Sequence, residues 1–220
     1  MVEAAKDLFL FFSALFPIVD PLGGSPIFLA LTRQYPAGTR RDLSWQIAVN
    51  SFFLLVGSYF VGTHILSFFG ISIPVVQVGG GLIVISTGWT LLKQRPDDDP
   101  KQTKRHIHPE NPLSHAFYPL TLPLTVGPGS ISVAITLGAN APHHQGLNFP
   151  AILAAIVGSA LLAISIFLCY GFADRLARVL GATAMTVIMQ LTSFLLVCIG
   201  VQIFWNGAKV LLASVLTSIH

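Results

Sequence analysis

The stretch that decides the fold is FPIVDPLGGSP, residues 16–26, together with a second copy, YPLTLPLTVGP, at residues 118–128. The two copies align residue for residue, and prolines coincide at 17/119, 21/123 and 26/128. Both copies lie inside long apolar segments. A proline in a helix interior removes a hydrogen bond and clashes with the preceding turn, which costs about 3 kcal/mol. Three prolines with neighbouring glycines therefore predict that both apolar helices are interrupted near their middle.

The composition indicates an integral membrane protein. Of 220 residues, 53% are hydrophobic and only 10% are charged, and the mean hydropathy is +0.74. A soluble domain carries about 25% charged residues. A disordered chain needs low hydrophobicity and high net charge, so that class is excluded as well. Long apolar segments that span a bilayer account for the composition.

Six segments are apolar over the length of about 20 residues that a membrane span requires. They are residues 7–32, 45–66, 73–92, 116–139, 149–171 and 186–208. We expect an all-α membrane protein, because an open strand edge cannot face lipid. The hydrophilic segment 93–115 predicts a linker between a first three-helix repeat, residues 1–92, and a second, residues 116–220. An odd number of helices in each half makes the two repeats inverted relative to one another. Beyond the motifs the similarity fades, although Gly70 and Gly181 each precede a third span.

The distribution of basic residues predicts the orientation in the membrane. Only Lys6 and Lys209 fall on one predicted side. The other side collects Arg33, Arg40, Arg41, Lys93, Arg95, Lys101, Lys104, Arg105, Arg175 and Arg178. We therefore expect both termini on the periplasmic or extracellular side and the linker in the cytoplasm. Aromatic residues at the expected span ends are interpreted as interfacial anchors: Trp45, Trp89, Tyr118, Tyr170 and Trp205.

Paired helix interruptions at corresponding places in two repeats are the best sequence indication of a transporter's binding site. We expect the half-helices to restart at Pro26 and Pro128, because proline suits the first helical position. Their N–H groups and positive dipole ends would then face one anionic group of a solute. The candidate substrate-binding residues are Asp20, Gly23, Gly24, Ser25, Thr121, Thr125, Gly127, Gly129 and Ser130. The alternative is that both interruptions only bend helices for packing.

Asp20 is the one acidic residue in the middle of a predicted span. An ionised acid at the bilayer centre costs about 2.5–3.5 kcal/mol on insertion scales. Asp20 could bind a cationic amino group or carry a coupling proton, or it could cap the interrupted turn by accepting backbone N–H bonds. The second copy has Leu122 at this position.

Other patterns favour packing. Gly79, Gly80 and Gly81 indicate close contact with a neighbouring helix, and Ala151, Ala155, Ser159 and Ala163 form a ladder of small residues. No nucleotide-binding loop, nucleophile elbow, zinc signature or nucleic-acid-binding motif is present. We expect no enzyme activity, no cofactor, no metal site and no nucleic-acid partner. Cys169 and Cys198 lie in apolar segments and are expected to be buried hydrophobes.

The motifs resemble those of the MarC family of bacterial and archaeal inner-membrane proteins, relatives of the lysine-exporter superfamily. The resemblance rests on Asp20–Leu29, on Phe69–Ser72 leading to Gly79 and Gly80, and on Phe117–Ile131. It implies six spans, both ends outside, and interrupted first and fourth helices. It also implies transport of small neutral amino acids such as glycine or alanine, coupled to protons. The chain departs from the family pattern at Gly24, Gln190 and Ser193, which puts the glycine and alanine specificity in question.

The sequence thus predicts a secondary transporter of a small zwitterionic solute such as glycine or alanine in the inner membrane, with a proton as the candidate coupling ion. The alternatives are a non-transporting membrane scaffold or sensor, a transporter of another small solute, and a channel. Asp20→Asn separates the transporter from the scaffold: transport should fall severely in a transporter, whereas a scaffold should change only in stability. The direction of transport, the identity of the coupling ion and the oligomeric state are not encoded in any pattern of the sequence.

Overall fold

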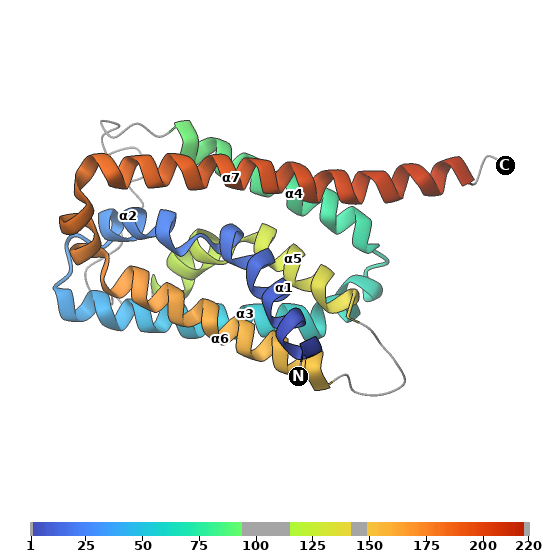
Figure 1. Cartoon of the computed structure of the whole chain (residues 1–220), viewed down its shortest axis with the longest axis horizontal. Helices are drawn as coiled ribbons and strands as arrows, with labels where there is room; N and C mark the ends of the chain where they lie inside the picture. The colour runs from blue at the N-terminus through green and yellow to red at the C-terminus, as the bar shows by residue number, and fades with distance from the viewer. Residues whose placement is uncertain (1, 94–114, 142–148, 218–220) are drawn as a thin grey trace.

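The chain folds into helices arranged in three layers, as the computed structural model shows (Figure 1). It describes residues 2–93, 115–141 and 149–217. The helices are α1 (Val2–Val19), α2 (Pro21–Leu31), α3 (Ala37–Phe68), α4 (Ile73–Lys93), the π-helical η3 (Ala116–Thr125), α5 (Pro128–Ala139), α6 (Phe149–Gly171) and α7 (Ala173–Thr217). Almost the whole of the predicted linker 93–115 lies outside the described residues.

Five segments among the described residues are long and apolar enough to cross a membrane. They are Ala5–Leu31, Ala37–Phe68, Ile73–Lys93, Phe149–Gly171 and Thr183–Leu216. A sixth is obtained if η3 and α5, which meet at an angle of 70°, count as one span. The all-helical class is therefore confirmed, and the five segments overlap the corresponding predicted spans, whereas the count of six spans stays a prediction. Several helices extend beyond the predicted bounds, and the last apolar segment has 34 residues instead of the 23 of 186–208.

The two interrupted helices form the middle layer. In Figure 1, α4 and α7 lie on one side of α1, α2 and α5, and α3 and α6 lie on the other. The packing agrees, because α5 contacts both α3 and α4, and α2 contacts both α6 and α7. Both interruptions are thus covered by protein, which is the condition for irregular backbone at membrane depth.

The outer layers present large apolar side chains to their surroundings. Exposed examples include Phe53, Leu191, Phe194, Leu212 and Leu216. Trp45, Trp89, Tyr118 and Trp205 are also more than half exposed, as expected of interfacial anchors. Tyr170 is different: it is only 2% exposed, so its interpretation as an anchor is wrong.

One end of the bundle gathers the basic loops. The connection between α2 and α3 lies at the same end as the turn between α6 and α7 (Figure 1). An ion pair between Arg40 and Asp174 joins these two places. Grouping the basic residues at one end agrees with the charge pattern, whereas the side of the membrane at which this end lies stays a prediction.

Glycines with positive φ start two of the spans. Gly70 has φ 67° before α4, and Gly181 has φ 75° within α7, where it separates a short first segment from the long span. Residues with an L side chain rarely adopt a positive φ. The two glycines that the sequence placed before third spans thus both have a positive φ, while the repeat relation between the halves stays a prediction.

The α4–α7 interface is made of backbone in close contact. A Cβ atom on Gly81 would lie 2.5 Å from the Phe204 backbone nitrogen, and one on Gly200 would lie 2.7 Å from the Ile85 backbone nitrogen. Gly88 and Gly207 make similarly close approaches to the opposite helix. Gly80 instead faces Ser132 of α5, and Gly79 has no atom within 4 Å of a built Cβ. The predicted packing role is confirmed for Gly80 and Gly81 and is wrong for Gly79.

Three of the four small residues in the predicted ladder on α6 are buried, whereas the fourth, Ala163, is only partly buried. Ala151, Ala155 and Ser159 are buried, and the neighbouring Gly158 lies against the ring of Phe11 on α1. Small residues allow helices in a membrane to approach closely.

The glycine contacts predict an asymmetric result for two neighbouring alanine substitutions. Gly81→Ala places a methyl group against backbone atoms of α7 that cannot rotate away, so we expect a loss of about 1–3 kcal/mol of stability. Gly79→Ala, two residues away, has open space and serves as the control. Thermal unfolding of the purified proteins in detergent measures the difference, and equal unfolding temperatures would contradict the close contact.

Candidate functional site

The first interruption is confined to one residue. Asp20 adopts a left-handed conformation, φ 44° and ψ 63°, between the end of α1 and Pro21, the first residue of α2. The Asp20 N–H donates to the carbonyl of Phe16 at 2.9 Å, and the Gly24 N–H donates to the carbonyl of Asp20 at 2.9 Å. The expected restart at Pro26 is therefore wrong: Pro26 lies inside α2. Pro21 begins the helix instead because the preceding Asp20 can act as its N-cap.

The Asp20 carboxylate caps its own helix. Its Oδ1 accepts a hydrogen bond from the Gly23 N–H at 3.0 Å. The capping role that the sequence left open is thus present, and it leaves Oδ2 for other partners. A Cβ atom on Gly23 would lie 2.1 Å from this Oδ2 and 2.7 Å from Oγ1 of Thr192 on α7. The Thr192 hydroxyl is therefore a neighbour of the carboxylate, and its place on a distant helix gave no signal in the sequence.

The second interruption combines the irregular segment η3, in which Tyr118 and Leu122 have extended backbone conformations, with a sharp bend. Thr121 and Thr125 donate their hydroxyl hydrogens to carbonyl groups five residues earlier, those of Ala116 and Leu120, at 2.7 and 2.8 Å. Both threonines are buried. The bend follows at Val126 and Gly127, and α5 begins at Pro128 as predicted.

The start of α5 differs chemically from the start of α2. Gly127 is the N-cap of α5, and no side chain caps the first turn. Ser130 is buried and donates its hydroxyl hydrogen to the carbonyl of Gly127, while Gly129 lies against Val84 of α4. The first turn of a helix carries unpaired N–H groups and partial positive charge. One interruption therefore ends in a carboxylate and the other in an uncapped helix N-terminus.

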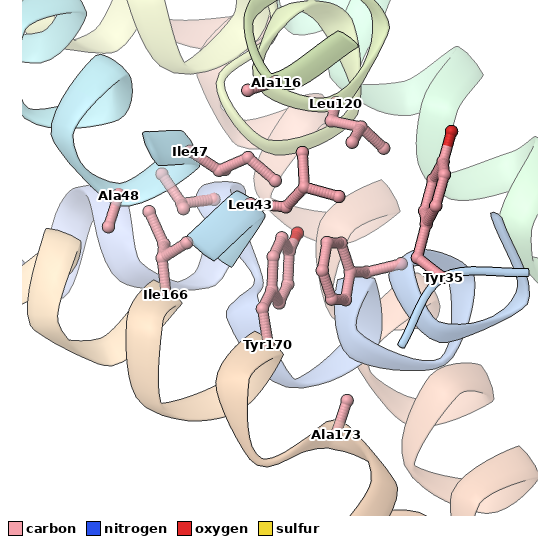
Figure 2. Packing of buried hydrophobic residues seen from close by; sticks show 11 residues of the cluster. Tyr35, Leu43, Ile47, Ala48, Ala116, Leu120, Ile166, Tyr170 and Ala173 are labelled. Atoms are coloured by element: carbon pink, nitrogen blue, oxygen red, sulfur yellow. The ribbon is translucent and has the colours of Figure 1, made fainter. Parts of the chain in front are cut away.

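Tyr170 of α6 links the two interruptions. Its hydroxyl oxygen Oη lies 3.1 Å from Oγ1 of Thr125, and a Cβ atom on Gly24 would lie 2.5 Å from the same Oη. Figure 2 shows Tyr170 within the buried cluster that also contains Leu43, Ile47 and Leu120. The sequence motifs did not point to Tyr170, since a tyrosine at a span end is equally typical of an interfacial anchor.

The predicted site residues thus fall into three groups. Asp20, Gly23, Gly24, Thr121 and Thr125 lie at the two interruptions, with Gly24 and Thr125 joined through Tyr170. Gly127, Gly129 and Ser130 form the start of α5. Ser25 is fully buried, but its hydroxyl donates to the carbonyl of Leu22 within its own helix. Asn50 of α3, which the motifs did not indicate, approaches Thr121 with 3.4 Å between Nδ2 and Oγ1.

Comparison with known proteins assigns the chain to a family. A family model described as MarC family integral membrane protein matches residues 5–212. The chain belongs to the MarC family. It is similar to the inner membrane protein MarC of Salmonella typhimurium and to that of Citrobacter koseri, each 31% identical over 94% of this chain and 96% of the relative. The membrane protein YvbG of Bacillus subtilis is 30% identical over 90% of this chain and 92% of its own length.

No solved structure matches the MarC-family chain. The names of the relatives and the apolar helices support an inner-membrane protein with several spans. Those names state no substrate.

The geometry at Asp20 predicts the effect of two substitutions on stability. Asparagine can accept the Gly23 N–H bond and tolerates a left-handed conformation, so Asp20→Asn should leave stability unchanged or raised. Alanine removes the cap and tolerates this conformation poorly, so Asp20→Ala should lose about 2 kcal/mol. Thermal unfolding in detergent checks both proteins, and an alanine variant as stable as the asparagine variant would contradict the capping role.

Proposed function

We propose that this MarC-family protein is a secondary transporter of small neutral amino acids, with glycine and alanine as the first candidates and a proton as the coupling ion. The observation that carries the proposal is that the two helix interruptions of the middle layer carry unlike polar groups. A buried carboxylate lies at one helix interruption, and an uncapped helix N-terminus lies at the other.

A zwitterion carries one charged group complementary to each of these two protein groups. Its ammonium group would bind the Asp20 carboxylate, and its carboxylate would bind the N–H groups at Gly129 and Ser130, where a helix N-terminus favours an anion. In this arrangement only one helix N-terminus binds the solute carboxylate, since the N-terminus of α2 is occupied by Asp20. Thr121 and Thr125 add hydroxyl oxygens beside the second interruption.

Asp20 is also the residue proposed to take up and release the coupling proton. It is buried, lies within a predicted span, and makes no ion pair among the described residues. Ionisable residues in such positions are characteristic of proton relays and ion pathways.

A second candidate function is a non-transporting membrane scaffold or sensor. Two observations favour it: Asp20 already caps α2, and Gly129 packs against Val84, so structural roles explain part of each motif. This alternative predicts that Asp20 affects stability alone.

The test is uptake of radiolabelled glycine and alanine into proteoliposomes, with and without an inward proton gradient. We expect gradient-driven uptake by the wild type and a loss of at least about tenfold in Asp20→Asn, because the ammonium group loses its charged partner. The asparagine variant keeps the helix cap, so this loss reports the charge rather than the fold.

A folded wild type without flux of either amino acid would reject these substrates. Counterflow over a wider panel of amino acids would then distinguish another solute from the scaffold. Equal uptake by the wild type and by Asp20→Asn would overturn the role proposed for Asp20.

A further inference from the structure

The ring and the hydroxyl of Tyr170 have separate surroundings. The ring stacks on Phe28 of α2, with 4.8 Å between ring centroids and 13° between planes. A phenylalanine at position 170 would make the same stack, so packing of the ring does not require the hydroxyl. The hydroxyl lies instead between the two interruptions, against Gly24 and Thr125.

The direction of the Tyr170–Thr125 hydrogen bond follows from the other partner of Thr125. The Thr125 hydroxyl hydrogen is donated to the carbonyl of Leu120 at 2.8 Å. A hydroxyl has one hydrogen, so Tyr170 donates to Thr125 Oγ1 across 3.1 Å. Burial of a polar group is costly unless it is hydrogen-bonded, so the Tyr170 hydroxyl holds this position next to Thr125.

The space beside Gly24 is matched to the Tyr170 hydroxyl. A Cβ atom on Gly24 would lie 2.5 Å from Oη but 3.3 Å from the next ring atom, Cζ. A methyl group on Gly24 and the hydroxyl oxygen of Tyr170 therefore exclude one another, whereas a methyl group and a phenylalanine ring nearly fit.

We propose that Tyr170 is the specificity-determining residue of the site, because its hydroxyl fills the space between Gly24 and Thr125 that the side chain of a larger amino acid would need. This inference rests on the proposed transport function and adds the feature that limits the size of the solute. A solute with little or no side chain would not need this space.

The proposal predicts which solute is transported better, relative to glycine, when the hydroxyl is removed. In Tyr170→Phe, one oxygen atom is missing and Thr125 Oγ1 loses its donor. Serine carries a hydroxyl that can occupy this space and donate to Thr125. The ratio of serine to glycine transport, each measured as kcat/KM, should rise about tenfold, the size expected for one additional fitted hydrogen bond.

The reciprocal variant supplies a second measurement. Gly24→Ala in the wild-type background places a methyl group against the hydroxyl, so the ratio of alanine to glycine transport should fall severalfold. The double variant Gly24→Ala with Tyr170→Phe removes the clash and should restore the ratio of alanine to glycine transport to within about threefold of its value in Tyr170→Phe. A role in folding alone would change total activity without changing these ratios.

Tyr35→Phe is the matched control. Tyr35 belongs to the same buried cluster (Figure 2), and its hydroxyl is buried without a hydrogen-bond partner in the described part of the chain. Removing that hydroxyl should leave the serine to glycine ratio unchanged.

The experiment measures uptake of glycine, alanine and serine by proteoliposomes containing each full-length variant. If Tyr170→Phe has the same transport ratios of serine and alanine to glycine as the wild type, the inference is overturned. The proposed function is still supported in that case, provided that the wild type transports. If Tyr170→Phe does not fold, an unchanged alanine to glycine ratio in Gly24→Ala overturns it. A folded wild type that transports none of the three overturns the proposed substrates and this inference together.

Discussion

The structure depends on one constraint: backbone N–H and C=O groups within a membrane need partners inside the protein. The two interrupted helices, α1–α2 and η3–α5, cannot pair all their backbone groups internally, because each contains a cluster of prolines. Both are therefore enclosed by four long helices that have no comparable cluster, and side chains supply part of what the backbone lacks. Asp20 accepts the Gly23 N–H at one interruption, and threonine hydroxyls donate to backbone carbonyls at the other. The polar groups of the candidate site are the same groups that make the interruptions tolerable.

The sequence predicted the helical class, the position of the spans and the location of both interruptions. Apolar length and proline clustering act locally, so these properties can be inferred from adjacent residues. The restart at Pro26 was wrong for a reason that is also local. Pro21 and Pro26 both suit a first helical position, and the choice depends on Asp20, which can adopt a left-handed conformation and accept the Gly23 N–H. The pairing of inverted repeats stays a prediction.

The contacts between distant segments could not be predicted in the same way. Tyr170 and Trp45 were both interpreted as interfacial aromatic residues, yet Trp45 is exposed, whereas Tyr170 is buried with its hydroxyl against Gly24, far away in the chain. Thr192 reaches Asp20 only through the packing of α2 on α7. Gly79 and Gly81 are two residues apart and look alike in sequence, but only Gly81 faces the opposite helix. Such differences depend on how a helix is rotated against its neighbour, and composition does not determine that rotation.

The pairing of the outer helices also restricts how the molecule can change shape. α4 belongs to the first half of the chain and α7 to the second, and their backbones touch at glycines; α3 and α6 are likewise drawn from opposite halves. The two halves of the sequence are therefore interlocked, and neither can tilt as a rigid body without separating both outer pairs. A motion that keeps these pairs intact would displace one outer layer relative to the other across the interrupted helices. The unit that moves would then be a pair of helices, one from each half of the chain.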